Sequence, residues 1–355
     1  MQHTDFIIVG SGLAGVTLAH TLHEGGYKFK IISDPALSNC SMVAAGIYNP
    51  VVFFRITKSY MADFVLPFAI DFYRNIETRI NQNLIQEQSI ARLFTSISEQ
   101  QLWEKRREEG VGIYLGEIKE DAIPSTSGTS NNPIGVVKNS GSLHCRVYLN
   151  TSLNYFNDSV IREKFDHEKI VFHEREVEYK NTIAKKIIFC EGHLISNNPF
   201  FKEVALKPVK GEVLTIKFDE ALPLNISEYI INKKCFLLPL GDNRYKAGAT
   251  YNWKNINEDT TPEALQELRK NVEDIISQPF SVLSHHAGVR PAAADRRPIL
   301  GLHTRYPQLA IFNGLGTKGV MLAPYFANEL VQSMVNGKVL HKEVDVGRFF
   351  AHANG

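Results

Sequence analysis

Cysteine is scarce in this chain of 355 residues, and its four cysteines are widely separated. Cys40, Cys145, Cys190 and Cys235 form no C-x-x-C pair, so neither a metal site nor a disulfide scaffold is predicted, and reduced, buried thiols are the default. No apolar run approaches the length of a membrane-spanning helix. The N-terminal residues lack the charged segment, long apolar core and cleavage site of a secretory signal. From these absences we expect a cytoplasmic protein without a membrane span.

An excess of charge is also missing. Lys and Arg number 39 against 38 Asp and Glu, which gives a formal net charge of +1. Proteins that bind nucleic acid or anionic lipid non-specifically usually show a basic excess on one face. The balance therefore argues against nucleic acid as a partner without excluding it. The length favours two domains, or one large interrupted domain, over a single small core.

The chain does contain a strong motif near its start, DFIIVGSGLAG at residues 5–15. Residues 6–9 are a short apolar run that predicts a strand buried on both faces. Gly10, Gly12 and Gly15 then have the spacing G-x-G-x-x-G, and residues 16–23 have helical apolar spacing. Glycines at these places permit a tight turn, the approach of a pyrophosphate and close helix packing. This order of strand, turn and helix predicts a dinucleotide site rather than an ordinary glycine turn.

An acidic residue is expected at the end of the second strand, where it would bond the ribose. That strand, residues 28–32, is followed by Ser33 and Asp34, so the ribose position falls to one of these two. The small residues of SMVAAG, at 41–46, then indicate close packing, either between elements or against a bound cofactor.

The middle of the chain predicts a second kind of architecture. Residues 60–81 are expected to form a helix with an apolar stripe at Phe64, Phe68, Phe72 and Ile76. Ser98 and Gln101 predict a capping box for a further helix. Strands are predicted at 213–218, 229–231, 236–239 and 245–250, with a hairpin turn at 241–243, and a helix opens at Thr261.

Two later segments return to the pattern of the first motif. IIFCEG, at residues 187–192, reads as a buried strand that ends in glycine. Near the end, a strand at 309–312 runs into NGLGTKG at 313–319, and a helix is expected from about residue 323. Two glycine-rich turns meeting at one crevice would suit a long cofactor.

Taken in order, DFIIVGSGLAG, SMVAAG, IIFCEG, GVRPAAADRRPILG and NGLGTKGVMLAP resemble the FAD-dependent oxidoreductases of the D-amino-acid oxidase and glycine oxidase type. The resemblance implies an α/β fold in which a doubly wound, Rossmann-like FAD-binding domain is interrupted by a substrate domain (α+β) with a mostly antiparallel sheet. The expected boundaries are 1–50, 140–205 and 285–355 for the FAD-binding domain, and 51–139 and 206–284 for the substrate domain. Non-covalent FAD is the implied cofactor.

The same resemblance implies roles for particular residues. Arg290 matches the arginine that binds the substrate carboxylate, and a guanidinium suits this role because it donates two parallel hydrogen bonds. A structural salt bridge is the alternative for Arg290. Lys318 would stabilise charge on reduced flavin or contact substrate, or else face solvent at a helix start, and His286 is a wall residue or a base. The implied FAD-binding residues are Gly10, Ser11, Gly12, Leu13, Ala14, Gly15, Ser33 or Asp34, Ser41, Ala44, Ala45, Gly46, Val177, Gly192, Gly314, Leu315, Gly316, Thr317, Lys318, Gly319 and Val320.

Amine oxidation is the resulting hypothesis: hydride passes from the C–N carbon of a small carboxylate-bearing amine to flavin N5, and oxygen or a quinone or other electron carrier reoxidises the flavin. Phe236 stands where some relatives have a tyrosine, a departure that puts a simple amino acid in doubt. DRRP and GLGTKG are more similar to the oxidase half of the bifunctional enzyme that modifies the wobble uridine of tRNA, so a carboxymethylaminomethyl uridine is an alternative substrate. A nicotinamide-dependent dehydrogenase and a non-catalytic flavoprotein are further alternatives.

Overall fold

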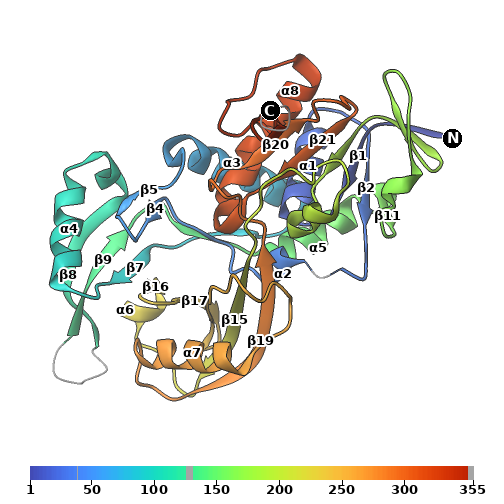
Figure 1. Cartoon of the computed structure of the whole chain (residues 1–355). Coiled ribbons are helices and arrows are strands. Elements are labelled where there is room, and N and C mark those ends of the chain that lie inside the picture. Colours follow the sequence, from blue (N-terminus) through green and yellow to red (C-terminus); the bar gives the residue numbers. More distant parts are fainter. Residues whose placement is uncertain (38, 125–130, 351–355) are drawn as a thin grey trace.

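Two large sheets dominate the computed structural model of the chain, which describes residues 1–37, 39–124 and 131–350. One sheet lies in the upper right of Figure 1 with the N-terminus, and the other curves through the lower left. Each sheet has eight strands. The chain crosses between them more than once, so that segments distant in sequence lie together.

The first sheet is built around β1 (Gln2–Val9), whose residues Phe6 to Val9 are buried. β1 pairs in parallel with β2 (Phe29–Ser33) on one side and with β14 (Thr182–Phe189) on the other. β11 (Val160–Arg162) and β21 (Leu309–Asn313) extend this parallel arrangement. Antiparallel strands complete the edges: β12 (Ile170–Phe172), β13 (Val177–Tyr179) and β20 (Ile299–Leu302). The predicted parallel sheet, with its late return through IIFCEG, is confirmed.

Helices from several parts of the chain pack together on this sheet. α1 (Leu13–Glu24) contacts α8 (Gly319–Asn336) and α5 (Cys145–Tyr155). α3 (Ala62–Ile80) also packs on α8, and its Tyr73 hydroxyl donates a hydrogen bond to the Val320 carbonyl at 3.0 Å. The predicted domain boundaries place α3 in the substrate domain, yet its buried face belongs to the same core as α1 and α8.

The second sheet has the order β19-β15-β18-β17-β16-β7-β9-β8. Neighbouring strands pair antiparallel, except that β16 and β7 pair in parallel. α7 (Pro262–Glu273) packs on β15 and β18, and α4 (Ile97–Arg107) on β8. The strands are β7 (Ile90–Leu93), β8 (Leu115–Pro124), β9 (Asn131–Val137), β15 (Val209–Phe218), β16 (Ile230–Asn232), β17 (Phe236–Gly241), β18 (Arg244–Gly248) and β19 (Phe280–Arg290).

Shorter elements connect these two parts. A small sheet joins β3 (Ile47–Tyr48), β10 (Gly141–Leu143) and β6 (Ile85–Glu87), and β4 (Val51–Val52) pairs with β5 (Thr57–Lys58). The short helices are α2 (Cys40–Val43), α6 (Leu224–Ser227) and α9 (Gly347–Phe350). The 3₁₀ turns are η1 (Gly110–Tyr114), η2 (Asn157–Ser159), η3 (His167–Lys169), η4 (Gly192–Asn197) and η5 (Gly316–Lys318). None of the helices in the described residues combines the length and apolarity of a bilayer-spanning segment.

The predicted apolar stripe of α3 is half wrong. Phe72 and Ile76 are buried, but Phe64 is 68% exposed and Phe68 is only partly covered. Residues four apart advance by about 40° around a helix of 3.6 residues per turn, so a strict four-residue stripe drifts off the packed face. The buried face instead combines three- and four-residue steps: Val65, Leu66, Ala69, Phe72, Tyr73 and Ile76.

The predicted cap of α4 is wrong by two residues. Ser96, not Ser98, caps the helix: its hydroxyl accepts a hydrogen bond from the Glu99 N–H at 3.2 Å. The Glu99 carboxylate in turn accepts from the N–H of Thr95 and pairs with Arg92, both at 2.8 Å. Ser96 and Glu99 together form an S-x-x-E motif. The ion pair between Glu99 and Arg92 favours this cap because Arg92 belongs to β7, so the pair ties α4 to that strand.

Candidate functional site

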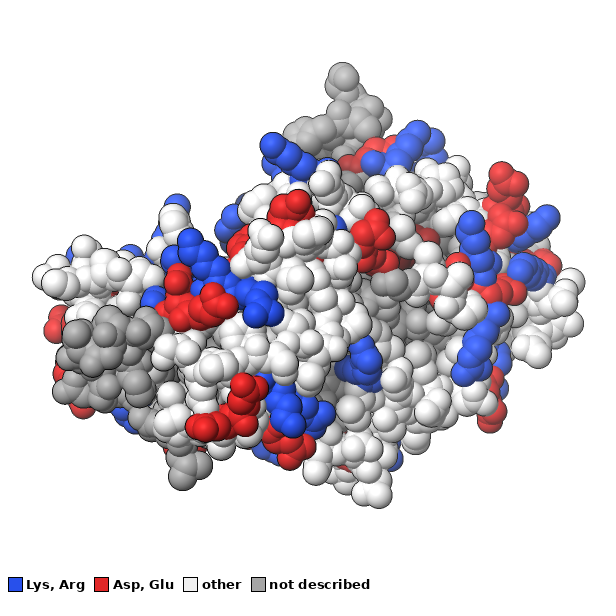
Figure 2. Space-filling view, turned by 90° about the horizontal axis from the view of Figure 1, so that it is seen from below, with Lys and Arg blue, Asp and Glu red and all other residues white. Residues whose placement is uncertain are grey.

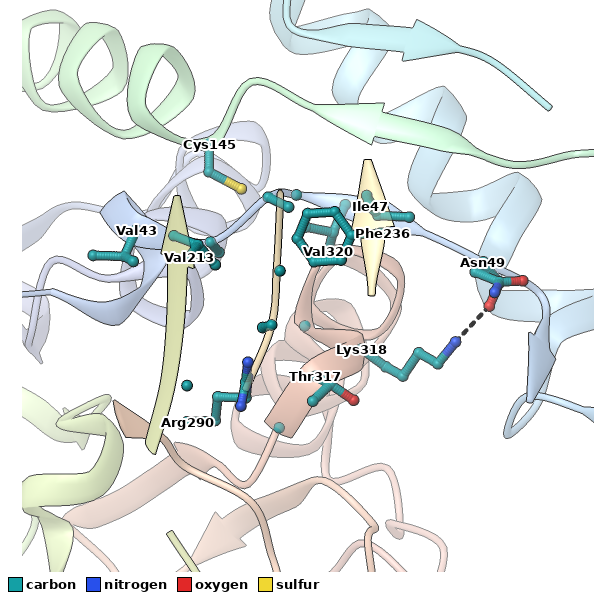
Figure 3. Close-up of a pocket in the computed structure, with 18 of the residues that line it drawn as sticks. Val43, Ile47, Asn49, Cys145, Val213, Phe236, Arg290, Thr317, Lys318 and Val320 are labelled. Atoms are coloured by element: carbon teal, nitrogen blue, oxygen red, sulfur yellow. Dashed lines mark hydrogen bonds between the residues drawn. The ribbon is translucent and has the colours of Figure 1, made fainter. Parts of the chain in front are cut away.

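A pocket of about 400 Å³ lies where the two large sheets meet. Figure 3 shows Arg290 pointing into it from β19, with Thr317 and Lys318 on the turn η5 and Val320 in the first turn of α8. Phe236 of β17 also lines the pocket. Of the other labelled side chains, Val43, Ile47 and Asn49 follow β2, Cys145 begins α5, and Val213 comes from β15 of the second sheet. Its lining includes these predicted site residues: Leu13, Ser41, Ala44, Ala45, Gly46, Arg290, Gly316, Thr317, Lys318, Gly319 and Val320.

The two glycine-rich turns meet at this pocket. A Cβ on Gly319, at the start of α8, would lie 2.9 Å from Cδ2 of Leu13, at the start of α1. The later turn is also held to the strand that bears Arg290, because the Gly316 N–H donates to the Pro291 carbonyl at 3.2 Å. The Asn313 amide donates to the Gly192 carbonyl at 2.8 Å, which joins the ends of β21 and β14. The structure therefore brings together the segments that the sequence assigned to one crevice.

The three glycines of the first turn are required for different reasons. A Cβ on Gly10 would lie 2.4 Å from the Cys190 carbonyl oxygen, and one on Gly15 would lie 1.9 Å from the Gly10 carbonyl oxygen. Gly12 has no such obstacle, because the nearest atoms would be side-chain atoms of Asn39 at 3.4 Å and beyond. The protein itself thus needs the first and third glycines. The absence of a Cβ at Gly12 fits an external ligand that approaches the backbone there.

Helix α1 starts in a manner that suits an anion. Gly12 is its N-cap and supplies no side-chain cap, and the first turn contains no acidic residue. The Leu13 N–H donates to the Ser41 hydroxyl at 3.2 Å. A helix N-terminus with uncapped N–H groups and its partial positive charge attracts phosphate groups. Together with the open face of Gly12, this end of α1 fits the pyrophosphate of a dinucleotide.

At the end of β2, Ser33 and Asp34 occupy different settings. The Ser33 hydroxyl lies 2.6 Å from that of Ser11, within the glycine-rich turn. The Asp34 carboxylate accepts a hydrogen bond from the Ala36 N–H at 2.9 Å and so closes its own turn. Of the two, Ser33 is the one in contact with the predicted nucleotide loop, and we favour it as the ribose partner.

The small-residue segment lies between the two sheets. Gly46 has φ +74°, and a Cβ there would lie 2.0 Å from the Leu143 carbonyl oxygen. Lys246, from β18 of the second sheet, donates to the carbonyl oxygens of Val43 and Ala44 at 3.2 and 3.1 Å. These are the last carbonyls of the short helix α2, where a cation is favourable. Lys246 therefore attaches the small-residue segment to the second sheet.

Arg290 is placed by an unusual strand contact. Its guanidinium lies across Gly211 of β15, where a Cβ would be 2.0 Å from Nη2 and 2.3 Å from Cζ. Nη1 donates to the Thr250 carbonyl at 3.3 Å, and the guanidinium stacks 4.7 Å from the centre of the Tyr251 ring. Burial lowers the pKa of Arg290, although arginine stays cationic at neutral pH because its ordinary pKa is so high.

Lys318 lies on the other side of the pocket and points toward β3. Its ammonium group donates to the Asn49 carbonyl at 2.8 Å, the contact drawn as a dashed line in Figure 3. Burial lowers the pKa of Lys318 to about 8. The side chain therefore places a titratable cation at the pocket, rather than facing solvent as the alternative held.

A family comparison decides the class of protein. Residues 5–333 match the family described as DAO, FAD dependent oxidoreductase. The chain belongs to this family. It is therefore a FAD-dependent oxidoreductase, and FAD rather than a nicotinamide nucleotide is its cofactor.

The curated relatives of this oxidoreductase include glycine oxidase of Bacillus subtilis, which is 25% identical over 196 residues and matches 52% of this chain. The bifunctional protein of tRNA 5-methylaminomethyl-2-thiouridine biosynthesis from Leptospira interrogans is 23% identical over 98% of this chain. The matches span 50% of the length of the former and 59% of the latter.

Solved structures show the same fold. Glycine oxidase from Geobacillus kaustophilus superimposes with a TM-score of 0.79, at 18% identity, over 98% of each chain. Iminodiacetate oxidase from a Chelativorans species has a TM-score of 0.77, at 18% identity, and covers 97% of this chain and 98% of its own. The predicted α/β fold, with a FAD-binding domain and an antiparallel second sheet, is confirmed.

Some predicted site residues lie outside the pocket lining of the oxidoreductase. His286 is exposed on β19, paired with Val213, and its side chain is not part of the lining. Alternation along β19 puts His286 on the same face as Gly288 and Arg290, so its direction does not exclude it. It lies four residues from Arg290, about 13 Å along the strand, and so beyond the edge of the pocket. Val177 is fully buried in β13, and Gly192 opens η4 with φ +59°. Ser11, Ala14, Gly314 and Leu315 support the two turns without lining the pocket.

Sequence reasoning missed Gly211, Asn49 and Tyr251, all of which line the pocket. A glycine inside a strand often marks a close approach of another group, and Gly211 carries that signal. Asn49 contributes its backbone carbonyl, which no side-chain pattern reveals. Tyr251 follows β18 in a segment that continues beside β15, where Asn252 pairs with Lys210, and it lies just beyond the strand that was predicted at 245–250.

Proposed function

We propose that this oxidoreductase oxidises the C–N bond of a small amine that carries a carboxylate, and that Arg290 binds the carboxylate. The observation that supports this most directly is an unpaired guanidinium in the pocket. Within residues 1–37, 39–124 and 131–350, no carboxylate forms an ion pair with Arg290. A partly buried charge without an oppositely charged partner is costly, so the position of Arg290 favours an anionic ligand.

The geometry around Arg290 suits a carboxylate anchor. One guanidinium face rests on Tyr251, and Nη1 is engaged by the Thr250 carbonyl, so the orientation of the planar group is fixed. A guanidinium donates to a carboxylate through two parallel hydrogen bonds. Fixing the acid group in this way would hold the neighbouring carbon at a set position in the pocket, which is the main contribution a protein makes to cofactor chemistry.

Bound FAD would supply the redox chemistry by accepting a hydride from the substrate carbon. The residues that would hold it are the glycine-rich turn at Gly10 to Gly15, the small-residue segment at 41–46 and the turn at 314–320. The apolar side chains of Val213, Phe236 and Val320 line the pocket and limit access of water. Lys318 would offer positive charge to an anionic group there.

The test is anaerobic bleaching of the flavin absorption band by a panel of amines: D-amino acids, glycine, sarcosine, proline and carboxymethylaminomethyl uridine. We expect at least one carboxylated amine to bleach the wild-type holoenzyme. Arg290→Ala should abolish bleaching by that amine, while Arg290→Lys should retain part of it, because a lysine keeps the charge but not the paired hydrogen bonds. The exposed Arg175→Ala serves as a matched control. Unchanged bleaching in Arg290→Ala would remove Arg290 from the role.

A carboxymethylaminomethyl group on a tRNA wobble uridine is the second candidate substrate. The alignment with the Leptospira tRNA-modifying protein, which covers nearly the whole chain, favours it. Figure 2 argues the other way, since Lys and Arg are interspersed with Asp and Glu on the face shown, with broad neutral areas between them. Binding to tRNA should weaken as salt rises if it depends on phosphate contacts. Affinity that is independent of salt would argue against an RNA substrate.

A further inference from the structure

Two aromatic rings stand exposed at the mouth of the pocket. Tyr251 and Trp253 are 55% and 65% exposed, and their rings are stacked, with centroids 6.0 Å apart and an angle of 24° between the planes. Single exposed apolar residues are ordinary, but a contiguous pair beside a binding pocket often marks a ligand surface. Tyr251 itself lines the pocket.

The pair is continuous with the carboxylate anchor. The Arg290 guanidinium lies 4.7 Å from the centre of the Tyr251 ring, and the Trp253 ring follows at 6.0 Å from the Tyr251 ring. A ligand whose acid group binds Arg290 would therefore lie next to Tyr251, and the exposed Trp253 ring is within reach of any part of that ligand that extends beyond the pocket. These two distances suit a ligand with a short linker between its acid group and the part that contacts the two rings.

The loop that carries the rings is held firmly from beneath. Asn252 forms two backbone hydrogen bonds with Lys210 of β15, at 2.9 and 3.0 Å. The Asn252 side chain accepts from the N–H groups of Lys254 and Asn255 at 2.8 and 3.1 Å. Because alternate residues of an extended segment face the same way, fixing Asn252 directs Tyr251 and Trp253 to the same side.

A buried lysine reinforces this anchor. Lys210 is 0% exposed, and its ammonium group donates to the Asn257 side chain at 2.7 Å and lies 3.5 Å from the Glu212 carboxylate. The loop is thus attached to the sheet at Asn252 and again at Asn257. The ring surface is preorganised, which reduces the entropy that a ligand would lose in ordering it.

We propose that Tyr251 and Trp253 form a stacking platform for a planar ring carried by the substrate on the far side of its amine. This proposal rests on the carboxylate-binding role of Arg290 and narrows the substrate to a carboxylated amine that bears an aromatic or heteroaromatic ring. A nucleobase and the ring of a free aromatic amine share this chemistry. Aliphatic substrates such as glycine would leave the platform unused.

The first test compares two unreactive acids, phenylacetate and cyclohexylacetate, by the shift that each causes in the flavin spectrum of the holoenzyme. Stacking on an aromatic surface favours the planar ring, and we expect phenylacetate to bind about fivefold more tightly or better. A merely apolar mouth predicts the reverse order, since cyclohexane is the more apolar ring. Equal affinities, or a preference for cyclohexylacetate, would overturn the platform.

Variants locate the effect. Trp253→Ala and Trp253→Leu should lose the preference for phenylacetate while binding acetate as the wild type does, because Arg290 is untouched; the leucine keeps apolar area without an aromatic face. Tyr251→Phe should retain the preference. Phe64→Ala, which removes a ring of similar exposure (68%) outside the pocket, is the matched control. A preference that survives both Trp253 variants would contradict the proposal.

Tryptophan fluorescence gives a readout that needs no turnover. The chain has two tryptophans, and Trp103 is fully buried, so acrylamide should quench chiefly Trp253. Phenylacetate should protect Trp253 from this quenching, and cyclohexylacetate should protect it less. Equal protection by the two acids would again count against stacking.

Two further ligands distinguish the sources of the ring: carboxymethylaminomethyl uridine as a free nucleoside, and the same base in an anticodon stem-loop. Tighter, salt-sensitive binding of the stem-loop than of the nucleoside would identify an RNA-borne base. Equal affinities for the stem-loop and the nucleoside would identify a free small molecule. In either case we expect Trp253→Ala to lose affinity for both ligands. Failure of every amine to bleach the flavin would refute the proposed oxidation but leave the preference for a planar acid as a separate result.

Discussion

At the scale of single residues, the placement of Arg290 depends on a glycine. Gly211 lies opposite Gly288 in the register of β15 and β19, and the guanidinium occupies the space where a Gly211 side chain would be. Arg290 is the flexible partner, so a methyl group on β15 would move the guanidinium rather than the strand. Gly211 therefore provides the space that the guanidinium needs in the proposed carboxylate site.

Gly211→Ala should therefore weaken the binding of carboxylates without unfolding the protein. A hydrogen bond to a charged group contributes about 1.5–3 kcal/mol, so loss of the aligned guanidinium should reduce the affinity for acetate or phenylacetate by about tenfold or more. Spectral titration of the holoenzyme measures this. Gly110→Ala is the control, since a Cβ there would meet nothing closer than 3.9 Å. Unchanged affinity in Gly211→Ala would show that Arg290 does not bind the acid in the pose described.

Lys318 provides a second prediction at this scale. Because its pKa is lowered to about 8, the side chain is charged below that pH and neutral above it. FAD carries negative charge, so its affinity for the apoprotein should fall as pH rises through 8, by up to about tenfold per pH unit. Lys318→Arg should keep its affinity at high pH, and Lys318→Met should have a low affinity that does not change over this range. Titration of apoprotein with FAD by flavin fluorescence gives the values. An identical pH profile in all three proteins would exclude Lys318 as the group responsible.

At the scale of elements, the sequence predicted those whose signals are local. The strand, turn and helix at residues 5–24 follow from a β-branched run and the glycine spacing. The start of α7 was also predicted, because Thr261 is its N-cap and Pro262 is its first residue. Register within a sheet is not local in this sense. No strand was predicted at residues 280–290, where β19 lies, and no local signal could show that Gly211 and Gly288 would face each other beneath Arg290.

Strand β15 shows why other boundaries were missed. Its predicted start was residue 213, but the strand begins at Val209. The first residues were missed because two of them, Lys210 and Glu212, are charged and yet buried. Charged side chains normally indicate a surface or a loop. Here Glu212 accepts hydrogen bonds from Thr261, through its N–H at 2.9 Å and its hydroxyl at 3.0 Å, and lies 2.9 Å from His285. Only the folded chain brings these partners together, so no local pattern indicated that the charges would be satisfied inside.

At the scale of the whole molecule, the proposed FAD site is assembled from both ends of the chain, and one core connects the two sheets. The cluster that contains Leu13 and Val320 also contains Val137 of β9 and Trp103 of α4, the helix that packs on the second sheet. A ligand that binds only the native arrangement stabilises everything that unfolds with it. The two sheets are therefore expected to respond to FAD together.

Trp103, buried in α4 on the second sheet, can report this response in a Trp253→Phe variant. FAD at about 100 times its Kd should add about 2.7 kcal/mol to the free energy of unfolding. The midpoint of the Trp103 fluorescence transition should then rise by on the order of 5 °C, together with the far-UV circular dichroism transition. NAD at the same concentration is the control and should cause no shift. If FAD moved the circular dichroism transition but left Trp103 unaffected, the second sheet would be unfolding independently, and a site shared between the sheets would be untenable.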